Sequence, residues 1–523
     1  MNTGNTNRNR TRIGTPCISD GTVPASEFWI FVQNYAFQFW IFVQNQGFEF
    51  WIFVHRMIYH AFHRGNSNMY LERKAYGKLI EWKETSKGST ALLINGARRV
   101  GKSHLAEEFG KKEYDSCIKI DFAQDGKSVR SMFEDDMDDL DLFFSKLSAL
   151  KTTKLHKRRS LIILDEVQLF PLARQKIKTL VADGRYDYIE TGSLLSIKAN
   201  VKDILIPSEE VKFTLNPLDF EEFLWAMGDR TSAEYLEDCF NNRRPVGEQI
   251  HKNMMNRFRE YVLVGGMPGV VSKYADTKDF AAADLIKRSI LDLYRDDIAK
   301  FAEGYEQKVL ALFDQIPSQL SKKEKKFTLS SLDKNARSRT YENAFMWLAD
   351  GMIVNQCFNA VDPSVGLSMN LDETSQKCYM ADTGLLVTHA LFDKDYADNH
   401  LYRAILLDKV NINEGMIMEN AVTQIFRASR HKLFFYSRSK TSKKNDAGET
   451  VTEKAIEVDF LTTKDGKVCP VEVKSSKYNS HSSLDRFLKK FGKRIGTPYI
   501  VYTKDLKVDG NIVFIPIYMS MFL

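Results

Sequence analysis

The stretch Gly96–Ser103, with the sequence GARRVGKS, has residue types and a spacing that suit the binding of a phosphate chain. Glycines in the pattern GxxxxGK[ST] let backbone N–H groups curl around an anion, the lysine reaches the outer phosphates, and the final hydroxyl can ligate Mg²⁺. The apolar run ALLI before the loop predicts a strand, and SHLAEEFG after it has helical spacing. A helix N-terminus would then lie beneath the phosphates. The stretch predicts a nucleotide site made by Gly96, Ala97, Arg98, Arg99, Val100, Gly101, Lys102, Ser103 and His104.

A pair of acidic residues, Asp165 and Glu166, follows directly after the apolar run SLIIL. An unbroken apolar run is typical of a strand buried on both faces of a parallel sheet. Asp165 is the candidate to hold Mg²⁺ opposite Ser103, and Glu166 is the candidate base that orients and deprotonates the attacking water. The next predicted strand, YDYIE, leads into Thr191–Ser193. Ser193 could lie beside the γ-phosphate, although Ser and Thr at strand ends are usually ordinary turn residues.

A third group of candidate residues lies in EVDFLTTKDGKVCPVEVK, residues 457–474. The pair Asp465-Gly466 predicts a two-residue hairpin turn, because a type I′ turn needs positive φ at both positions. This turn places Asp459 opposite Glu472, and Glu457 opposite Lys474, on one face of the hairpin. The other face is a predicted core face made by Val458, Phe460, Val471 and Val473.

Two opposed carboxylates destabilise a hairpin unless a positive charge lies between them. A divalent metal held by Asp459 and Glu472, with Lys474 to activate the attacking water, would resolve this conflict. The pattern Asp459…Glu472-x-Lys474 is that of the PD-(D/E)xK nuclease fold, and Glu419 matches the position of a further acid in it. The alternative is a structural hairpin in which Lys474 forms surface ion pairs worth at most ~1 kcal/mol. Glu457 stands where the pattern would have a Pro-Asp element, so the motif is only partly matched.

The bulk composition bounds the class of protein. A chain of 523 residues is expected to hold about three domains. The net charge of +6 permits an anionic partner such as nucleic acid without requiring one. The six cysteines form no CxxC pair, which argues against a zinc site or a disulfide framework and favours a reducing cytoplasm. No long apolar span follows residue 68, so a membrane is not an expected partner.

The N-terminal segment 1–68 differs from the rest of the chain. FWIFV occurs three times, beginning at Phe28, Phe39 and Phe50, with a period of eleven residues. Such a repeat beside an aperiodic chain suggests translated repeat DNA upstream of the real start. We expect the segment to be non-native or disordered, with synthesis starting at Met69 or, alternatively, at Met57. The other interpretation is an exposed aromatic tail used for association.

Five motifs taken together resemble a family of prokaryotic AAA-type ATPases whose C-terminal domain of unknown function has a restriction-nuclease-like fold. These motifs are INGARRVGKS, LDEVQ, ETGS, NPLDFEEFL and YVLVGGMPGVV, and ADTGLL at 381–386 adds to them. The resemblance runs from about Met69 to the C-terminus. It implies an α/β fold with a P-loop AAA-type parallel-sheet core at 69–225, a helical lid at 226–304, a winged-helix-like connector at 305–365 and a nuclease-like α/β domain at 366–523. It also places Gly265–Pro268 in the lid near the adenine.

The resemblance implies an ATP- and Mg²⁺-dependent hydrolase that drives or gates a nuclease-like domain acting on or binding DNA. An alternative is a slow-turnover, ATP-dependent switch whose C-terminal domain only contacts a protein partner. AAA-type enzymes normally use an arginine from a neighbouring subunit or a lid, and a homo-oligomer is possible here. Arg295 is available, but an ion pair with Asp296, Asp297 or a more distant acid is the simpler use of it. The arginine is therefore left unassigned.

Overall fold

The computed structural model describes residues 27–34, 37–44, 71–192, 207–322, 327, 338–364, 366–391, 398–406, 414–444, 450–476, 478 and 480–523. The chain divides into two units, Met1–Tyr70 and Leu71–Leu523. In the first unit, β1 (Glu27–Asn34) and β2 (Phe37–Gln44) pair antiparallel and contain the first two FWIFV copies. The third copy, Met57, Met69 and Ser193 lie outside the described residues.

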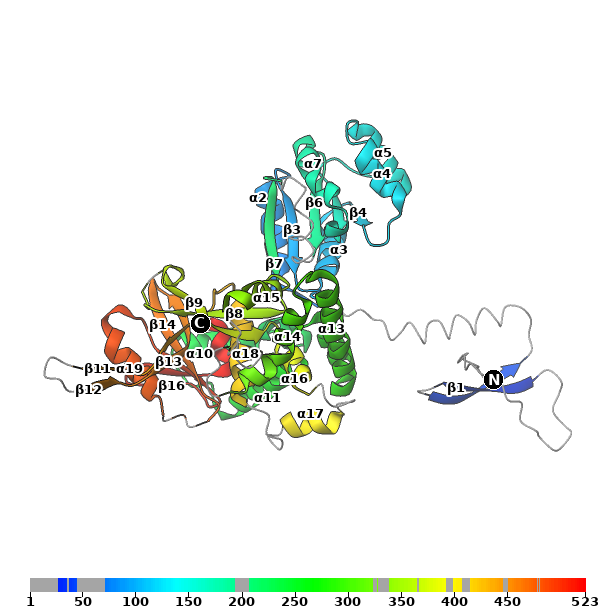
Figure 1. The fold of residues 1–523 in the computed structure, drawn as a ribbon. Coiled ribbons are helices and arrows are strands. Elements are labelled where there is room, and N and C mark those ends of the chain that lie inside the picture. Colours follow the sequence, from blue (N-terminus) through cyan, green and yellow to red (C-terminus); the bar gives the residue numbers. More distant parts are fainter. Residues whose placement is uncertain are drawn as a thin grey trace, which may run out of the picture. The chain divides into compact units, whose positions relative to one another are not determined.

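The second unit begins with a parallel sheet (Figure 1). Within the described residues it has five strands in the order β4-β5-β6-β3-β7, all paired in parallel. Their bounds are β3 (Ala91–Gly96), β4 (Ser116–Asp121), β5 (Ser160–Asp165), β6 (Asp187–Gly192) and β7 (Glu210–Leu215). The expected strands at ALLI, SLIIL and YDYIE are confirmed as β3, β5 and β6. β7 pairs with β3 on the side opposite to β6, and no strand was expected there from the sequence.

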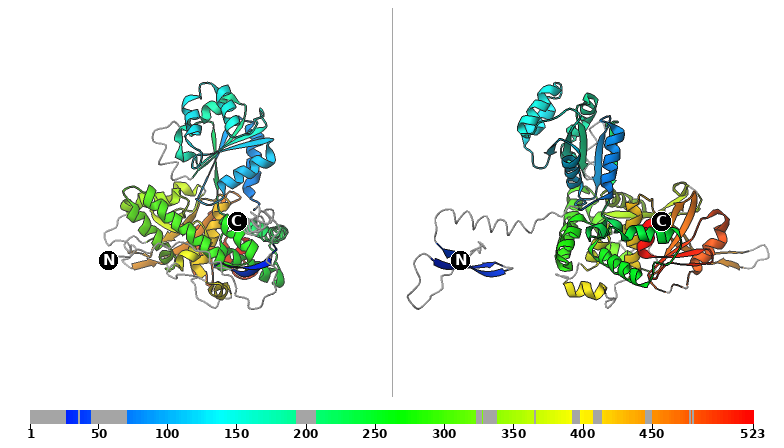
Figure 2. Two further views of the ribbon diagram at one scale, coloured as in Figure 1. Left: turned by 90° about the vertical axis from the view of Figure 1, so that its right-hand side faces the viewer. Right: turned by 180° about the vertical axis from the view of Figure 1, so that it is seen from behind.

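Helices cover both faces of this sheet (Figure 2). On one face, α2 (Lys74–Ser86) and α3 (Lys102–Glu113) pack residues such as Leu79 and Phe109 against the strands. The other face is covered by helices that supply Phe133, Phe143 and Ile177 to a second apolar cluster. These helices are α4 (Lys127–Asp135), α5 (Leu140–Leu150), α6 (Pro171–Gln175) and α7 (Ile177–Asp183). The sheet is thus buried on both sides, as the apolar runs predict.

The segment after the sheet is helical, and its role as a lid and connector stays a prediction. A capping box begins α9, because the Asp219 side chain accepts from the Glu222 N–H and Glu222 accepts from the Asp219 N–H. The helices are α9 (Phe220–Ala226), α10 (Ser232–Asn241), α11 (Glu248–Val264), α12 (Pro268–Thr277), α13 (Phe280–Phe301), α14 (Glu306–Leu320) and α15 (Ser338–Asp350). Among the described residues no helix is long and apolar enough to cross a bilayer.

The C-terminal part is built on a mixed sheet. Its described strands run in the order β16-β17-β15-β14-β13-β10-β8-β9. Their bounds are β8 (Val354–Ala360), β9 (Leu371–Met380), β10 (Phe434–Arg438), β13 (Ile456–Lys464), β14 (Lys467–Val473), β15 (Tyr499–Tyr502), β16 (Lys507–Asp509) and β17 (Ile512–Pro516). The predicted boundary between 365 and 366 falls between β8 and β9, which are paired strands of this one sheet.

The described residues of the C-terminal part also contain helices and a small two-stranded ribbon. Tyr379 of β9 packs against Phe460 of β13, and Phe426 of α18 packs against the same ring, so α18 lies against the sheet. The helices are α16 (Thr383–Ala390), α17 (Asn399–Leu406), α18 (Glu414–Ala428) and α19 (Ser482–Phe491). The ribbon is β11 (Thr441–Lys444) with β12 (Thr450–Glu453).

Candidate functional site

The phosphate-binding loop joins β3 to α3, as its motif predicts. Gly101 begins α3 with a φ of 94°, which lies in the left-handed region that favours glycine. A Cβ on Gly96 would lie 2.5 Å from the Leu215 carbonyl oxygen, so glycine lets β7 approach the loop. Lys102 is buried, and its Nζ donates to the Gly96 and Ala97 carbonyl oxygens at 3.1 and 3.0 Å. The ammonium therefore lies within the curve of the loop.

Burial affects the charge of this lysine. It lowers the pKa of Lys102 to about 8, although the nearby Glu166 and Asp165 carboxylates act in the opposite direction. A phosphate chain would add negative charge beside the ammonium and favour its protonated form. The loop is thus suited to an anion.

Asp165 ends β5 and is 3% exposed. Its Oδ1 accepts a hydrogen bond of 2.6 Å from the Ser103 hydroxyl, and the Thr191 hydroxyl donates to the same oxygen. The structure thus brings together the two predicted Mg²⁺ ligands, one from the first turn of α3 and one from the end of β5. A serine hydroxyl and a carboxylate are oxygen ligands of the kind that Mg²⁺ prefers, so the residues fit the ion.

Lys119 is a functional candidate that the sequence reasoning missed. Its Nζ lies 2.8 Å from Asp165 Oδ2 and 2.7 Å from Glu107 Oε1. Burial would raise the pKa of Asp165, but hydrogen bonds from Lys119, Ser103 and Thr191 outweigh it and lower the pKa. The pairing of Asp121 with Asp165 across parallel strands offers a signal, because Lys119 lies two residues before Asp121 and so on the same face.

Glu166 follows Asp165 in a left-handed backbone conformation, with a φ of 55°. Its N–H donates to the Thr191 hydroxyl at 3.4 Å, and its carboxylate accepts from the Gln168 side-chain amide. Gln168 is buried and precedes α6 in a short 3-10 turn at Val167–Leu169. The predicted base is therefore held by a residue of the LDEVQ motif itself, a positioning role that the sequence alone did not assign.

The lid motif Gly265–Pro268 packs directly on the phosphate-binding loop. A Cβ on Gly101 would lie 3.4 Å from Pro268 Cγ. The Gly266 N–H donates to Asp382 Oδ2 at 2.5 Å, and the Leu218 N–H donates to the Gly266 oxygen at 2.7 Å. The motifs NPLDFEEFL, GGMP and ADTGLL, which are far apart in the sequence, thus meet beside the loop. Their contact with the adenine stays a prediction.

Two arginines, Arg98 and Arg295, form ion pairs within the chain. Arg98 of the loop forms an ion pair with Asp297 of α13. Arg295 lies 3.0 Å from Asp314 and 3.7 Å from Asp292, which agrees with the expected ion pairing to a more distant acid. The arginine of a neighbouring subunit stays unassigned.

Near its turn the C-terminal hairpin has the predicted register, and the paired residues extend as far as Phe460 and Val471. The opposition of Asp459 to Glu472 and of Glu457 to Lys474 lies beyond these pairs and stays a prediction. Phe460 pairs with Val471 and Lys464 with Lys467, and Asp465 and Gly466 have φ values of 51° and 70°. The predicted core face is confirmed, since its four side chains are buried: Val458, Phe460, Val471 and Val473.

The acidic face of the hairpin carries more positive charge than the motif predicts. Lys474 Nζ lies 2.5 Å from Glu472 Oε1, as the structural alternative expected. Lys377 of β9 lies 3.0 Å from Glu457 Oε1 and 3.6 Å from Asp459 Oδ1. Burial would lower the pKa of Lys377, but the surrounding carboxylates outweigh it and raise the pKa.

A divalent metal does not fit this acidic face well. Within the described residues no group of three or more His, Cys, Asp or Glu side chains could hold a metal ion. Burial and the neighbouring Asp459 raise the pKa of Glu472, which disfavours its anionic form. Glu419 accepts a 2.9 Å hydrogen bond from the Tyr379 hydroxyl. The metal roles of Glu419, Asp459 and Glu472 and the catalytic role of Lys474 therefore stay predictions.

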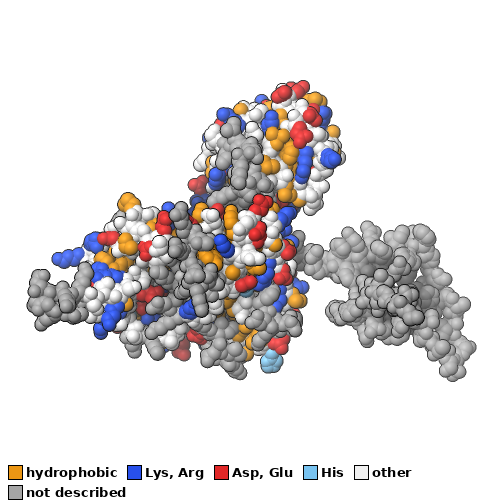
Figure 3. Space-filling view, in the orientation of Figure 1, with side chains coloured by type: hydrophobic (Ala, Val, Ile, Leu, Met, Phe, Trp, Pro, Cys, Tyr) orange, Lys and Arg blue, Asp and Glu red, His pale blue; other side chains and the backbone are white. Residues whose placement is uncertain are grey.

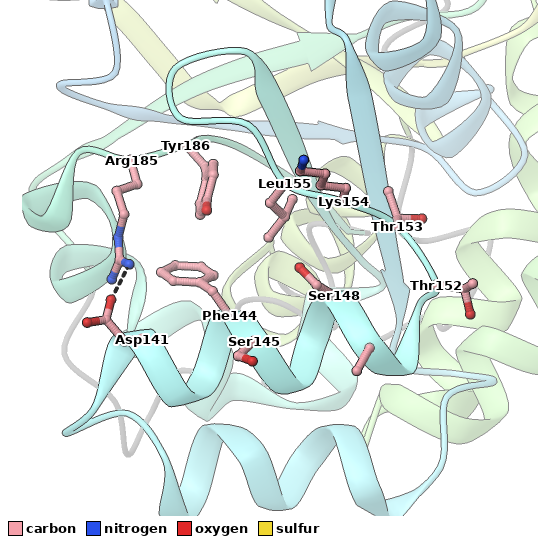
Figure 4. A pocket seen from close by; sticks show the side chains of 11 residues that line it. Asp141, Phe144, Ser145, Ser148, Thr152, Thr153, Lys154, Leu155, Arg185 and Tyr186 are labelled. Carbon is pink, nitrogen blue, oxygen red and sulfur yellow. Dashed lines mark hydrogen bonds and ion pairs between the residues drawn. The ribbon is translucent and has the colours of Figure 1, made fainter.

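A separate cavity of about 590 Å³ lies beside α5 (Figure 4). Phe144 and Tyr186 line it, and Arg185 pairs with Asp141 at 2.5 Å at its rim. It contains none of the predicted site residues. The cavity is therefore not a candidate for the nucleotide chemistry.

The phosphate-binding loop and the parallel sheet together form an α/β core of the P-loop kind. Residues 88–224 match the family model described as an AAA domain. Residues 255–396 and 414–519 match two domains of unknown function, DUF8612 and DUF4143. No curated protein matches the chain.

Three solved structures match the chain at low sequence identity. C. elegans PCH-2 is 11% identical with a TM-score of 0.19, over 33% of this chain and 47% of that chain. A chain of Drosophila ORC bound to DNA is 13% identical with a TM-score of 0.26, over 65% of this chain and 96% of that one. A Vibrio cholerae protein is 8% identical with a TM-score of 0.16, over 82% and 95%. This chain thus spans less than half the length of PCH-2, and matches at these scores carry no functional conclusion.

Proposed function

We propose that the chain hydrolyses ATP with Mg²⁺ in the cytoplasm and uses its nucleotide state to gate a C-terminal domain that binds or acts on DNA. The observation that carries the first part is the meeting of Ser103 and Asp165 at 2.6 Å, next to a buried Lys102. Lys102 would hold the outer phosphates, and Ser103 and Asp165 would hold Mg²⁺, which neutralises charge on the phosphates. Glu166, held by Gln168, would take the proton of the attacking water.

Gating is supported by a continuous set of buried polar contacts between the lid motif and α18. Asp382 accepts from the Gly266 N–H, and the next residue, Thr383, donates its N–H and hydroxyl to Gln424 Oε1 at 2.8 and 2.9 Å. Asn420 donates to the Thr383 hydroxyl at 3.0 Å. Glu419, on the same helix, accepts a hydrogen bond from the Tyr379 hydroxyl of β9. A displacement of the lid motif would therefore disturb contacts that position α18.

DNA as the partner is the part of the proposal that rests on the family resemblance. Among the described residues on the face drawn in Figure 3, Lys and Arg side chains are interspersed with Asp and Glu side chains. This mixed surface favours a contact with few phosphates and so a shallow dependence of DNA affinity on salt. No cleavage step is assigned to the hairpin, because its acids are already paired with lysines.

The test is ATP hydrolysis by the purified full chain, with and without plasmid, linear and single-stranded DNA. Lys102→Ala is expected to weaken binding of a fluorescent ATP analogue by roughly 10- to 100-fold, because a charge-assisted contact is lost. Lys111→Ala is the matched control, since Lys111 is an exposed lysine of the same helix. Glu166→Gln is expected to bind ATP normally and to lower kcat by roughly 10²- to 10⁴-fold.

The outcomes separate the two candidate functions. Hydrolysis that DNA stimulates supports the proposal. Tightly held nucleotide with negligible turnover, and no response to DNA, would instead support the slow switch that contacts a protein partner. Normal hydrolysis by Glu166→Gln would show that another group is the base.

A further inference from the structure

Lys377 is a buried lysine that the mechanism above does not use. It lies on β9, outside the hairpin and outside the predicted nuclease motif, and is 1% exposed. Its Nζ lies over the ring of Phe435, 5.0 Å from the centroid, and 3.0 Å from Glu457 Oε1. A fully buried ammonium is strongly disfavoured unless it is paired, so its partners define its role.

Those partners are the acids that were expected to hold a metal. Lys377 Nζ lies 3.6 Å from Asp459 Oδ1, and the other oxygen of Asp459 accepts a 2.9 Å hydrogen bond from the Val473 N–H. The second predicted ligand, Glu472, has Lys474 at 2.5 Å. Each predicted hairpin ligand thus already has a donor from this chain.

The position of Lys377 resolves the conflict of charge that the sequence raises. Opposed carboxylates on one hairpin face require a positive charge between or beside them. The motif suggested that a divalent ion supplies this charge. In the structure, the ammonium of Lys377 on β9 lies against Asp459 and Glu457 and supplies this charge instead.

We propose that Lys377 is the resident cation of the C-terminal acidic site, and that it takes the place of a divalent metal at Asp459. The site then forms without a metal ion. Its role is to bind a partner, and it does not catalyse metal-dependent hydrolysis. The charge balance of the acidic face does not depend on whether the chain hydrolyses ATP or binds DNA.

The experiment measures Mn²⁺ binding to the full chain without nucleotide, by the electron paramagnetic resonance signal of free Mn²⁺. The wild-type chain and Asp459→Asn are expected to bind Mn²⁺ equally weakly. Lys377→Met is expected to bind Mn²⁺ about tenfold more tightly or better, because one adjacent positive charge is lost and a place at Asp459 opens. Adding Asp459→Asn to Lys377→Met should abolish the gain.

Two controls separate this effect from a general change of charge or fold. Lys467→Met removes an exposed lysine of β14 in the same hairpin, and Lys377→Arg keeps the positive charge, so neither should gain Mn²⁺ affinity. The proposal would be overturned if the wild type bound Mn²⁺ and Asp459→Asn abolished that binding. This comparison does not require that the Lys377→Met protein folds. A folded Lys377→Met chain that gains no affinity would overturn it as well.

Discussion

Gly384→Ala tests whether the contact between the lid motif and the start of α16 holds the nucleotide loop in place. A Cβ on Gly384 would lie 2.3 Å from the Val264 oxygen and 2.6 Å from the Gly265 nitrogen. Both atoms are backbone, so relief requires a main-chain shift rather than a rotamer change. Overpacking of this kind costs about 1–3 kcal/mol, and alanine in a helix recovers at most ~1 kcal/mol relative to glycine. We expect the free energy of unfolding to fall by about 1 kcal/mol, and by at most ~3 kcal/mol if no helix propensity is recovered.

The matched control is Gly269→Ala. Gly269 and Gly384 are each the second residue of a helix, α12 and α16, but a Cβ on Gly269 meets nothing within 4 Å. It should leave stability unchanged or raise it by up to ~1 kcal/mol. Urea unfolding gives the stability, and titration with a fluorescent ATP analogue gives the affinity. Because Pro268 lies on Gly101, affinity should fall in Gly384→Ala alone. Equal stability and equal ATP affinity in the two variants would refute the reasoning.

Two further predictions follow from buried and strained positions. Burial lowers the pKa of Lys287 to about 8, despite the nearby Asp284. Below about pH 8 the charged lysine therefore destabilises the folded chain by roughly 3 kcal/mol. This penalty is lost as the pH rises from 8 towards 10.5, the pKa of the lysine in the unfolded chain. The free energy of unfolding of the wild type, measured relative to Lys287→Met, should rise between pH 8 and 10, and a flat difference would contradict it. Gly466→Ala should destabilise the chain by roughly 1 kcal/mol in urea, because Gly466 has a φ of 70°. Gly77→Ala, in open space within α2, is its control and should not lose stability, and equal losses in the two variants would reject the turn assignment.

Local patterns predicted the parts of the site that lie within a few residues of each other. The loop at Gly96–Ser103 and the acid pair after β5 follow from motifs whose spacing encodes their geometry. The hairpin register follows from Asp465-Gly466, because the type of turn fixes which residues are opposed.

The residues that sequence reasoning missed are those that act across the fold. Lys377 approaches Asp459 from a strand three places away in the sheet order. Asp382 meets Gly266 through packing of α16 against the lid. Such contacts depend on strand order and on the way the sheet curves, and neither is encoded by the local spacing of one sequence. Lys119 is an intermediate case, since the pairing of neighbouring strand ends would place it near Asp165.

The pairing of β8 with β10 has a practical consequence for studying the C-terminal part by itself. A fragment that begins at residue 366 would keep β9 and β10 but lose β8, the strand that joins them. The backbone N–H and C=O groups of β10 that face β8 would then be open to any other extended chain. Such a fragment is expected to aggregate or to pair with itself, and its behaviour would say little about the protein. A cut before α15, which leaves β8 in place, keeps the sheet closed on that side.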